Sequence, residues 1–418
     1  MTLARQRSCR RWAAVAVAAA LAAGAQRSSP ATGPAQPEPQ RVVAVGDVHG
    51  DIDAFASILR EAGLIDAAGE WAGGGATLIQ LGDILDRGPR PRAVFDLLIR
   101  LEAEAQRAGG RVIVLLGNHE AMNLLGIVRD VNRDAWAEFV DDGSELRRAE
   151  ALAAFERLWR RRMADVGGDA ALTDDAAEQW LALHPLGFVE YSAAFGPSGR
   201  YGAWLRQRPA AVILADTLFI HGGYGPALAG VGVEEINHRT GLEIATFDET
   251  RAWMVAQDLA LPWSSAIELV AEAQRELDWV AAQAPGTVPA ERLGRVSRLQ
   301  LSWDRWYLMA EDGPIWFRGL ATWNEVEHGT EVAKLLDDLG VARQVVGHWP
   351  HPDGRIRSRF AGRVLLIDTG MLASVYGGRA SALEIAGGTV TAIYPGERQT
   401  LNAGVQAAAD ATVGTPGQ

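Results

Sequence analysis

The sequence predicts an α/β fold built on parallel strands. Three short apolar runs, at 42–45, 78–81 and 112–116, are separated by stretches whose apolar residues recur at helical spacing. Each run ends in a glycine that is followed at once by Asp or Asn. Strands that alternate with helices are typical of parallel β-α-β units, and such sheets keep their ligand sites at the carboxyl ends of the strands.

The composition is that of a globular protein with an acidic surface. Of the 418 residues, 48% are hydrophobic and 22% are charged, and the length allows two or three domains. The formal net charge is −12, and removal of residues 1–25, which carry four arginines and no acidic residue, takes it to −16. A charge this negative argues against binding to nucleic acid or to an anionic membrane.

Residues 1–25 have the pattern of a secretory signal peptide. Arginines precede an apolar stretch at 12–23, which is too short to span a bilayer, and a small-x-small cleavage site follows at 23–25. The pair Arg10-Arg11 also allows twin-arginine export, and an uncleaved anchor is the alternative. We expect a periplasmic or secreted protein without stable membrane insertion after cleavage.

The mature chain begins with a predicted flexible linker at 26–40, rich in Pro, Ser and Gln. The folded part is expected at 41–395. Its opening strand, 42–45, leads through a tight glycine turn into a predicted helix at 52–64. The run 78–81 precedes a second helix at 92–108, which Gly109-Gly110 ends, and the run 112–116 forms the third strand.

At 121–185 the alternation of predicted strands and helices stops, and most of the residues favour a helix. This segment is therefore predicted to be a helical insertion. We expect it to form a lid over the mouth of the sheet, and the alternative is a packed flank far from the site. Helices are also predicted at 248–284, and a disordered tail at 396–418. The later strands are predicted at 211–214, 217–220, 344–346, 363–367, 382–385 and 390–394.

Polar side chains gather where the predicted strands end. They are Asp47 with His49, Asp83 with Asp86 and Arg87, Asn118 with His119, and the single residues His221 and His348. Carboxylate, amide and imidazole ligands suit two divalent metal ions that share one carboxylate, and a mixed site of this kind accepts Mn, Fe or Zn. The first predicted site comprises Asp47, His49 and Asp83. The second comprises Asp83, Asn118, His221 and His348.

The charge of such a centre favours a phosphate monoester. Two ions about 3.5–4 Å apart clamp the attacking and leaving oxygens of an in-line displacement at phosphorus.

His119 directly follows Asn118, so it should lie near the metals without binding them and serve as general acid. Asp86 can orient His119 and raise its pKa, while Arg87 and Arg318 can hold the phosphate oxygens.

The motifs at 46–50, 82–88, 117–120, 221–223 and 347–348 resemble those of the calcineurin-like metallophosphoesterases. Their Asp-Arg-Gly and Asn-His-Glu forms are those of the phosphoprotein phosphatase branch. Further similarity to the Shewanella-like protein phosphatases lies at 122–126, 199–205, 313–319 and 368–371. The resemblance implies a β-sandwich of two mixed sheets flanked by helices, and a bimetal centre. It also implies a protein phosphatase that hydrolyses phosphotyrosine or phosphoserine/threonine by metal-activated hydroxide attack.

Two positions depart from the family pattern. Trp349 stands where relatives usually have Thr, and Phe317 where Tyr is common. The sequence leaves open whether His351 is a further ligand and whether Asp368 supports the ligands or only ends a strand. It also leaves two other functions open: a phosphodiesterase or nucleotide phosphatase on the same centre, and a non-catalytic binding module.

Overall fold

The computed structural model describes residues 41–165, 167–168, 171–283, 290–351 and 353–401. The expected signal peptide and linker lie outside the described residues, as does the expected tail from residue 402 on. All the residues that the structure describes belong to one compact unit.

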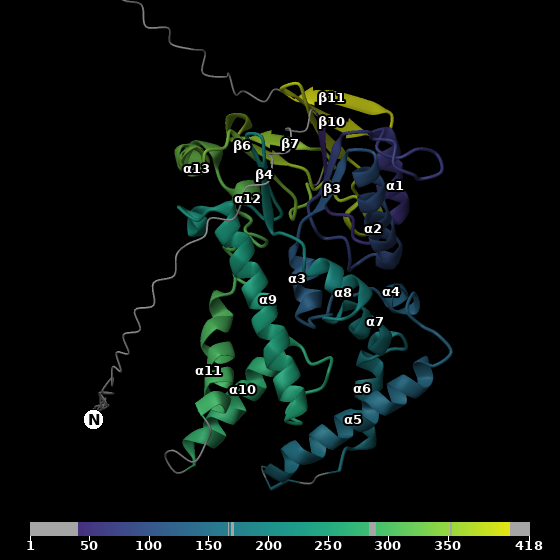
Figure 1. The fold of residues 1–418 in the computed structure, drawn as a ribbon, viewed down its shortest axis with the longest axis vertical. Helices are drawn as coiled ribbons and strands as arrows, with labels where there is room; N and C mark the ends of the chain where they lie inside the picture. Colours follow the sequence, from purple (N-terminus) through teal and green to yellow (C-terminus); the bar gives the residue numbers. More distant parts are fainter. Residues whose placement is uncertain (1–40, 166, 169–170, 284–289, 352, 402–418) are drawn as a thin grey trace, which may run out of the picture. The chain divides into compact units, whose positions relative to one another are not determined.

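The first sheet has six strands in the order β11-β10-β9-β1-β2-β3. Figure 1 labels β11 and β10 at one edge of this sheet and β3 at the other. Strands β1, β2 and β3 are parallel, as the sequence predicts, whereas β9 runs antiparallel to β1. The bounds are β1 Arg41–Val45, β2 Thr77–Gln80, β3 Arg111–Val114, β9 Ala382–Ala386, β10 Thr389–Tyr394 and β11 Glu397–Leu401.

The second sheet has five strands in the order β4-β5-β6-β8-β7. Its central strands are parallel and both edge strands are antiparallel to their neighbours. The bounds are β4 Ala211–Leu214, β5 Thr217–Ile220, β6 Arg343–Val346, β7 Arg357–Arg359 and β8 Val364–Leu366. Two mixed sheets with flanking helices confirm the predicted fold class.

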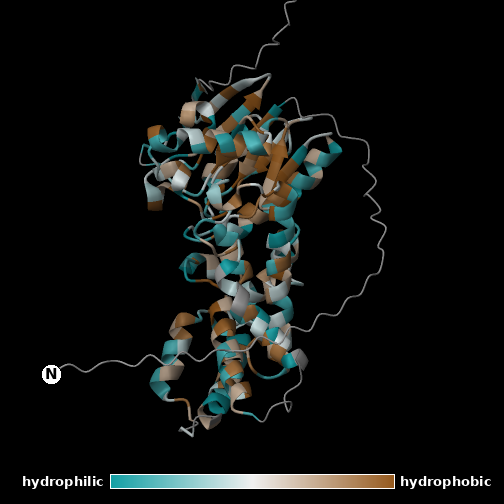
Figure 2. Ribbon diagram, turned by 90° about the vertical axis from the view of Figure 1, so that its left-hand side faces the viewer, coloured by the Kyte–Doolittle hydropathy of each residue, from teal (hydrophilic) through white to brown (hydrophobic). Residues whose placement is uncertain are grey.

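The strands pack through alternating side chains. On β1, Val42 and Ala44 join a core cluster that also contains Phe219 of β5 and Val345 of β6, so this cluster lies between the sheets. Val43 of the same strand joins the larger cluster that the helices cover. Both faces of the strand are therefore apolar, which is typical of a strand buried on two sides. In Figure 2 several strands are coloured brown, the colour of hydrophobic residues.

Helices cover the outer faces of the sheets. Helix α1, Ile52–Glu61, begins at Asp51, whose side chain accepts from the Ala54 amide, and it contacts α2, Pro91–Arg107. Helix α13, Glu325–Leu339, begins at Asn324 and ends at Gly340 in the left-handed conformation. These ends are ordinary caps and a C-terminal glycine. The sequence analysis predicted α1 but not α13.

A run of helices follows β3. It comprises α3 Asn118–Leu124, α4 Arg133–Ala137, α5 Ser144–Asp165, α6 Asp174–Leu183, α7 Phe188–Phe195 and α8 Arg200–Leu205. The helical region thus starts within the third motif and continues beyond residue 185, where we expected the insertion to end. Thr173 caps α6 by accepting from the Ala176 amide.

A second helical region follows β5. It comprises α9 Val233–Ala256, α10 Ala266–Ala281 and α11 Ala290–Ser302, and two short helices come later, α12 Gly319–Thr322 and α14 Ala373–Tyr376. Helix α10 starts with a capping box of Ser265 and Glu268, but α9 begins well before residue 248 and a break separates it from α10. None of the described helices has the length and apolar character needed to cross a membrane.

The prediction of a disordered tail from residue 396 was wrong for 397–401. These residues form β11, which pairs antiparallel with β10 after a turn at Gly396, whose φ is +70°. The strand is polar, Glu-Arg-Gln-Thr-Leu, and lies at the edge of the sheet, so it lacks the apolar alternation that marks strands in a sequence. The edge strand β7, Arg-Ser-Arg, was missed for the same reason.

Candidate active site

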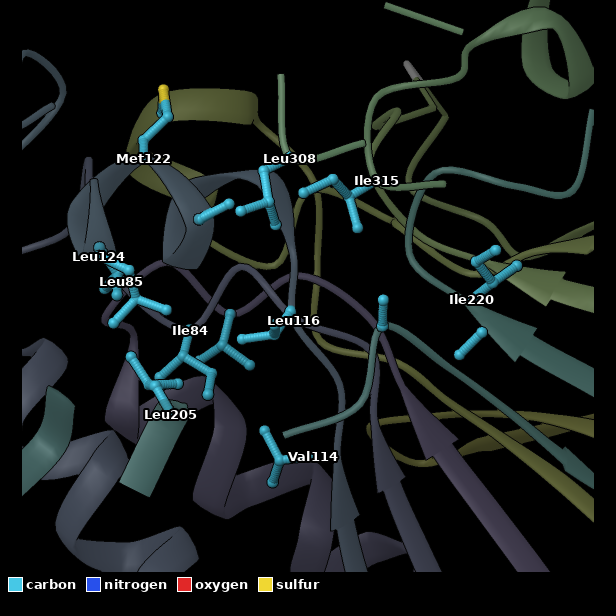
Figure 3. Packing of buried hydrophobic residues seen from close by; sticks show 14 of the residues in the cluster. Ile84, Leu85, Val114, Leu116, Met122, Leu124, Leu205, Ile220, Leu308 and Ile315 are labelled. Atoms are coloured by element: carbon cyan, nitrogen blue, oxygen red, sulfur yellow. The ribbon is translucent and has the colours of Figure 1, made fainter. Parts of the chain in front are cut away.

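The polar turns of the site are anchored by buried apolar residues on either side of them (Figure 3). Ile84 and Leu85 lie between Asp83 and Asp86, and both are fully buried. Leu116 precedes the Gly117-Asn118 turn, and Ile220 precedes His221. Packing of these neighbours holds the polar side chains in place at the ends of β2, β3 and β5.

Asp83 stands at the centre of the site. Its carboxylate is grouped with His49 and His119 on one side and with His221 and His348 on the other. Oδ2 of Asp83 lies 3.8 Å from His49 Nε2, and Oδ1 lies 3.4 Å from His221 Nε2. One carboxylate therefore faces both predicted metal positions.

Backbone hydrogen bonds orient two of the histidines. His49 Nδ1 donates to the Leu85 carbonyl and His221 Nδ1 donates to the Leu81 carbonyl, each at 2.9 Å. Both rings therefore present Nε2 to Asp83. A histidine whose other nitrogen is bound to a carbonyl is the usual arrangement of a metal ligand.

The second predicted site is completed by Asn118 and His348. Asn118 Oδ1 lies 2.9 Å from His221 Nε2. The ring centroids of His221 and His348 are 5.1 Å apart, and the buried His348 Nε2 has no hydrogen-bond partner among the described residues. Burial lowers the pKa of His348 to about 2, so the ring is neutral and its nitrogen is free to bind a cation.

Asp47 is paired with a second carboxyl group. Its Oδ1 accepts from the His348 amide at 3.1 Å, and its side chain is hydrogen-bonded to Asp368. Burial, Asp368 and Asp83 raise the pKa of Asp47 well above its ordinary value, and burial raises that of Asp368 to about 6. Asp368, which the sequence left open, is thus a support of the predicted ligand Asp47.

The donor set fits the divalent metals of this kind of site. Burial also lowers the pKa of His49, to about 3, so this ring is neutral as well. Buried carboxylates that face one another, together with neutral imidazoles, require a cation or shared protons for charge balance. The described residues therefore offer two adjacent mixed nitrogen and oxygen sites around Asp83.

Several site residues adopt a backbone conformation that L-residues avoid. The positive φ angles are 48° at His49, 55° at Asp83, 68° at Asp86, 63° at Arg87 and 70° at His348. Each such residue costs on the order of 1–3 kcal/mol. Strain of this kind persists where the surrounding structure holds it, and here it marks the same turns as the motifs.

His119 forms a buried pair with Asp86. The distance from His119 Nδ1 to Asp86 Oδ2 is 2.7 Å, and His119 Nε2 lies 3.9 Å from Asp83 Oδ2. Burial lowers the pKa of His119, but Asp83 and Asp86 outweigh it and bring the pKa above its ordinary value. The carboxylate of Asp130 lies beside the pair, although no sequence signal pointed to it.

Glu120 ties two motifs together, a role the sequence analysis did not assign. Its carboxylate accepts from the amides of Asp83 and Ile84 in the second motif and from the amide of Gly117 in the third, at 2.7–2.9 Å. Glu120 itself is fully buried. It thereby fixes the Asp83 turn against the turn that carries Asn118.

The two predicted phosphate-binding arginines lie on opposite sides of Asp83, each near a different group of histidines. Arg87 is an electrostatic neighbour of His49 and His119, whereas Arg318 is one of His348. The Arg87 guanidinium lies 5.5 Å from the ring of Tyr376, whose buried hydroxyl has no partner within the described part of the chain. Sequence reasoning had no signal for Tyr376.

Aromatic rings flank Arg318. Its guanidinium lies 5.7 Å from the ring of Trp316 and 5.8 Å from that of Trp349. Trp349 is 39% exposed, so this departure from the family pattern places an accessible ring beside Arg318. Phe317, the other departure, is buried against Trp323. His351 belongs to neither ligand group among the described residues.

Comparisons with known proteins agree with this geometry. Residues 40–352 match the calcineurin-like phosphoesterase family. An uncharacterized protein of Schizosaccharomyces pombe is 28% identical over 365 residues, which are 86% of this chain and 82% of the yeast protein. The chain has the fold of the cold-active protein-tyrosine phosphatase of a psychrophilic Shewanella, with a TM-score of 0.55 and 23% identity over 87% of this chain and 80% of that one.

Two curated relatives carry related names. Shewanella-like protein phosphatase 2 of Arabidopsis thaliana is 29% identical over 229 residues, which are 52% of each chain, so the match spans about half of the plant protein. Shewanella-like protein phosphatase 1 of Plasmodium berghei is 24% identical over 334 residues, which are 79% of this chain and 67% of the parasite protein.

Proposed function

We propose that this chain, which belongs to the calcineurin-like phosphoesterase family, is a two-metal protein phosphatase acting on phosphotyrosine or phosphoserine/threonine. The observation that carries the proposal is the position of Asp83. This one buried carboxylate is grouped with His49 and His119 on one side and with His221 and His348 on the other, and His119 is also paired with Asp86. Relatives named as protein phosphatases support the substrate class.

The six predicted ligands divide around Asp83. Asp47, His49 and Asp83 would hold one divalent cation, and Asp83 with Asn118, His221 and His348 the other. When bound, two such cations supply a Lewis acid that activates the attacking water and neutralises the developing charge at phosphorus. We propose Mn, Fe or Zn for both positions, since mixed nitrogen and oxygen sites accept each of them.

The remaining side chains have separate tasks. His119, whose pKa Asp83 and Asp86 raise, donates its Nε2 proton to the departing oxygen. Asp86 fixes the ring and stabilises its charged form. Arg87 and Arg318 bind the phosphate oxygens from opposite sides, because the planar guanidinium matches that geometry.

The test is phosphate release by the protein that lacks residues 1–25. The protein is stripped of metal, reloaded with Mn²⁺ and given phosphotyrosyl and phosphoseryl peptides of the same sequence. We expect release to return with the metal, and the ratio of the two rates gives the side-chain preference. Faster hydrolysis of bis-(4-nitrophenyl) phosphate than of either peptide would contradict the proposal and favour a phosphodiesterase.

We also propose that the protein is exported. The support is the basic and apolar pattern of residues 1–25 with its small-residue cleavage site. Expression of the full chain followed by N-terminal sequencing of the product tests this. Cleavage after residue 25 and recovery from the periplasm or the medium are expected, and an intact N-terminus on a cytoplasmic product would contradict the proposal.

A further inference from the structure

A chain of buried hydrogen bonds leads away from the His119–Asp86 pair. The amide nitrogen of Asn123 donates to both carboxylate oxygens of Asp86, at 3.1 Å each, and to the carbonyl of His119 at 3.0 Å. The hydroxyl of Tyr191 donates to the amide oxygen of Asn123 at 2.7 Å. All four side chains are 5% exposed or less.

Tyr191 belongs to the helical region, far along the chain from the motifs. It lies on α7, and its ring packs against those of Trp136, Phe139 and Phe195 at centroid distances of 4.4–5.1 Å. The hydroxyl therefore cannot swing to another partner without disturbing this aromatic cluster. The position of α7 thus determines where the Asn123 amide is held.

We propose that Asn123 and Tyr191 are positioning residues for leaving-group protonation: they hold the Asp86 carboxylate, and through it the His119 ring, in the donating orientation. The inference rests on the proposed function, because it requires His119 to act as general acid. It gives the helical region a task in the reaction.

The amide of Asn123 has one satisfactory orientation. Its nitrogen faces the Asp86 carboxylate, which only accepts, and its oxygen faces a hydroxyl that donates. Burial raises the pKa of Tyr191 well above its ordinary value, so this hydroxyl keeps its proton at any working pH. A flipped amide would place its oxygen against the Asp86 carboxylate, so that two acceptors would face each other. Asn123, held by Tyr191, consequently limits the orientation of the Asp86 carboxylate as well as binding it.

The first test uses two leaving groups. An alkyl phosphate, such as a phosphoseryl peptide, needs a proton on its leaving oxygen, whereas 4-nitrophenolate leaves without one. We expect N123L to lower kcat on the alkyl substrate about 10- to 100-fold, a part of the roughly 100- to 10,000-fold that general acid catalysis contributes, and kcat on 4-nitrophenyl phosphate less than threefold. Y191F should give a smaller loss in the same direction, because Asn123 still reaches Asp86.

A double-mutant cycle tests whether Asn123 acts through His119. In the H119N background, N123L should cost nothing further on the alkyl substrate, since the group it positions is gone. Equal losses with both leaving groups, or an additive loss in the H119N background, would overturn the inference. If H119N itself leaves alkyl turnover unchanged, the general-acid role in the proposed function fails instead.

Controls separate positioning from folding. Y201F removes a hydroxyl from the neighbouring Tyr201, which donates to Asp96, and it should change neither rate. The double variant N123L/Y191F also removes the Tyr191 hydroxyl that N123L alone leaves without its acceptor, so its melting temperature and metal content should match those of the native protein more closely than those of N123L do. A folded, metal-loaded double variant with native alkyl turnover would also overturn the inference.

Discussion

The carboxyl groups of Asp47 and Asp368 are hydrogen-bonded to each other at the buried end of the site. Asp47 and Asp368 are only 4% and 3% exposed, so water does little to separate their charges. Two buried carboxylates in contact favour a shared proton, and a cation bound by Asp47 has to displace it. Metal loading is therefore linked to pH at this pair.

We predict that metal binding weakens as the pH falls, because the pKa values of Asp47 and Asp368 are both raised above their ordinary values. A proton held by this pair competes with the cation, while the neutral His49 and His348 do not compete. Apparent affinity should fall about tenfold for each pH unit over the range in which one proton has to be displaced. Equilibrium dialysis against Mn²⁺ at pH 5.0 and pH 7.5 measures the change.

The variant D368N is the matched control for this prediction. Its amide can accept from the Gly370 amide as Asp368 does, and it can donate to Asp47 without carrying a proton that titrates. The difference in affinity between the two pH values should shrink in D368N. Equal acid sensitivity in both proteins would show that another group controls loading.

A second prediction concerns the alkaline limb of the profile of kcat against pH. His119 donates its proton, so turnover of an alkyl phosphate should fall as pH rises above the raised pKa of His119. H119N should bind metal, lose about 100-fold or more on the alkyl substrate and lose the alkaline limb. Profiles of kcat against pH measure this, and a limb that persists in H119N would assign it to another group.

A third prediction concerns Glu120. E120A leaves three buried amides, those of Asp83, Ile84 and Gly117, without an acceptor. We expect a loss of about 3–5 kcal/mol in the free energy of unfolding, since each unsatisfied donor costs about 1–3 kcal/mol. Denaturant unfolding of the metal-free protein measures it. E311A, at an exposed position, should change stability by less than about 0.5 kcal/mol.

A fourth prediction concerns the wall around Arg318. R318K keeps the charge but loses the planar fork, so kcat/KM for a phosphopeptide should fall about tenfold or more. W349A removes one flanking ring and should raise KM two- to fivefold, the size of a partly exposed cation–π contact. Steady-state kinetics measure both. R357A, in an exposed ion pair with Asp353, is the control and should have no effect.

The fold was predictable where apolar runs and turn residues agree. Strands β1, β2 and β3 were located within one or two residues because each is an apolar run that ends at a glycine. Strand β11 was missed because it is a polar edge strand held by pairing to β10, and pairing leaves no pattern in the sequence. In β11 the hydrogen bonds to β10, rather than the local composition, determine that the segment is a strand.

The clustering of the site residues followed from the same logic. Side chains at the ends of parallel strands meet at one edge, so Asp83, His49 and His221 were expected together and lie together. Their roles as ligands stay predictions. The supports Asp130, Asn123 and Tyr191 were not predicted, because their contacts depend on how the helical region packs.

A two-metal site centred on Asp83 can be tested by the metal content of the native protein and of D83N, measured together with phosphate release from a phosphopeptide. We predict two divalent cations per native chain, loss of both from D83N, and loss of activity in parallel, because Asp83 faces both groups of predicted ligands. Native activity in a protein with one cation or none, or in D83N, would contradict this prediction.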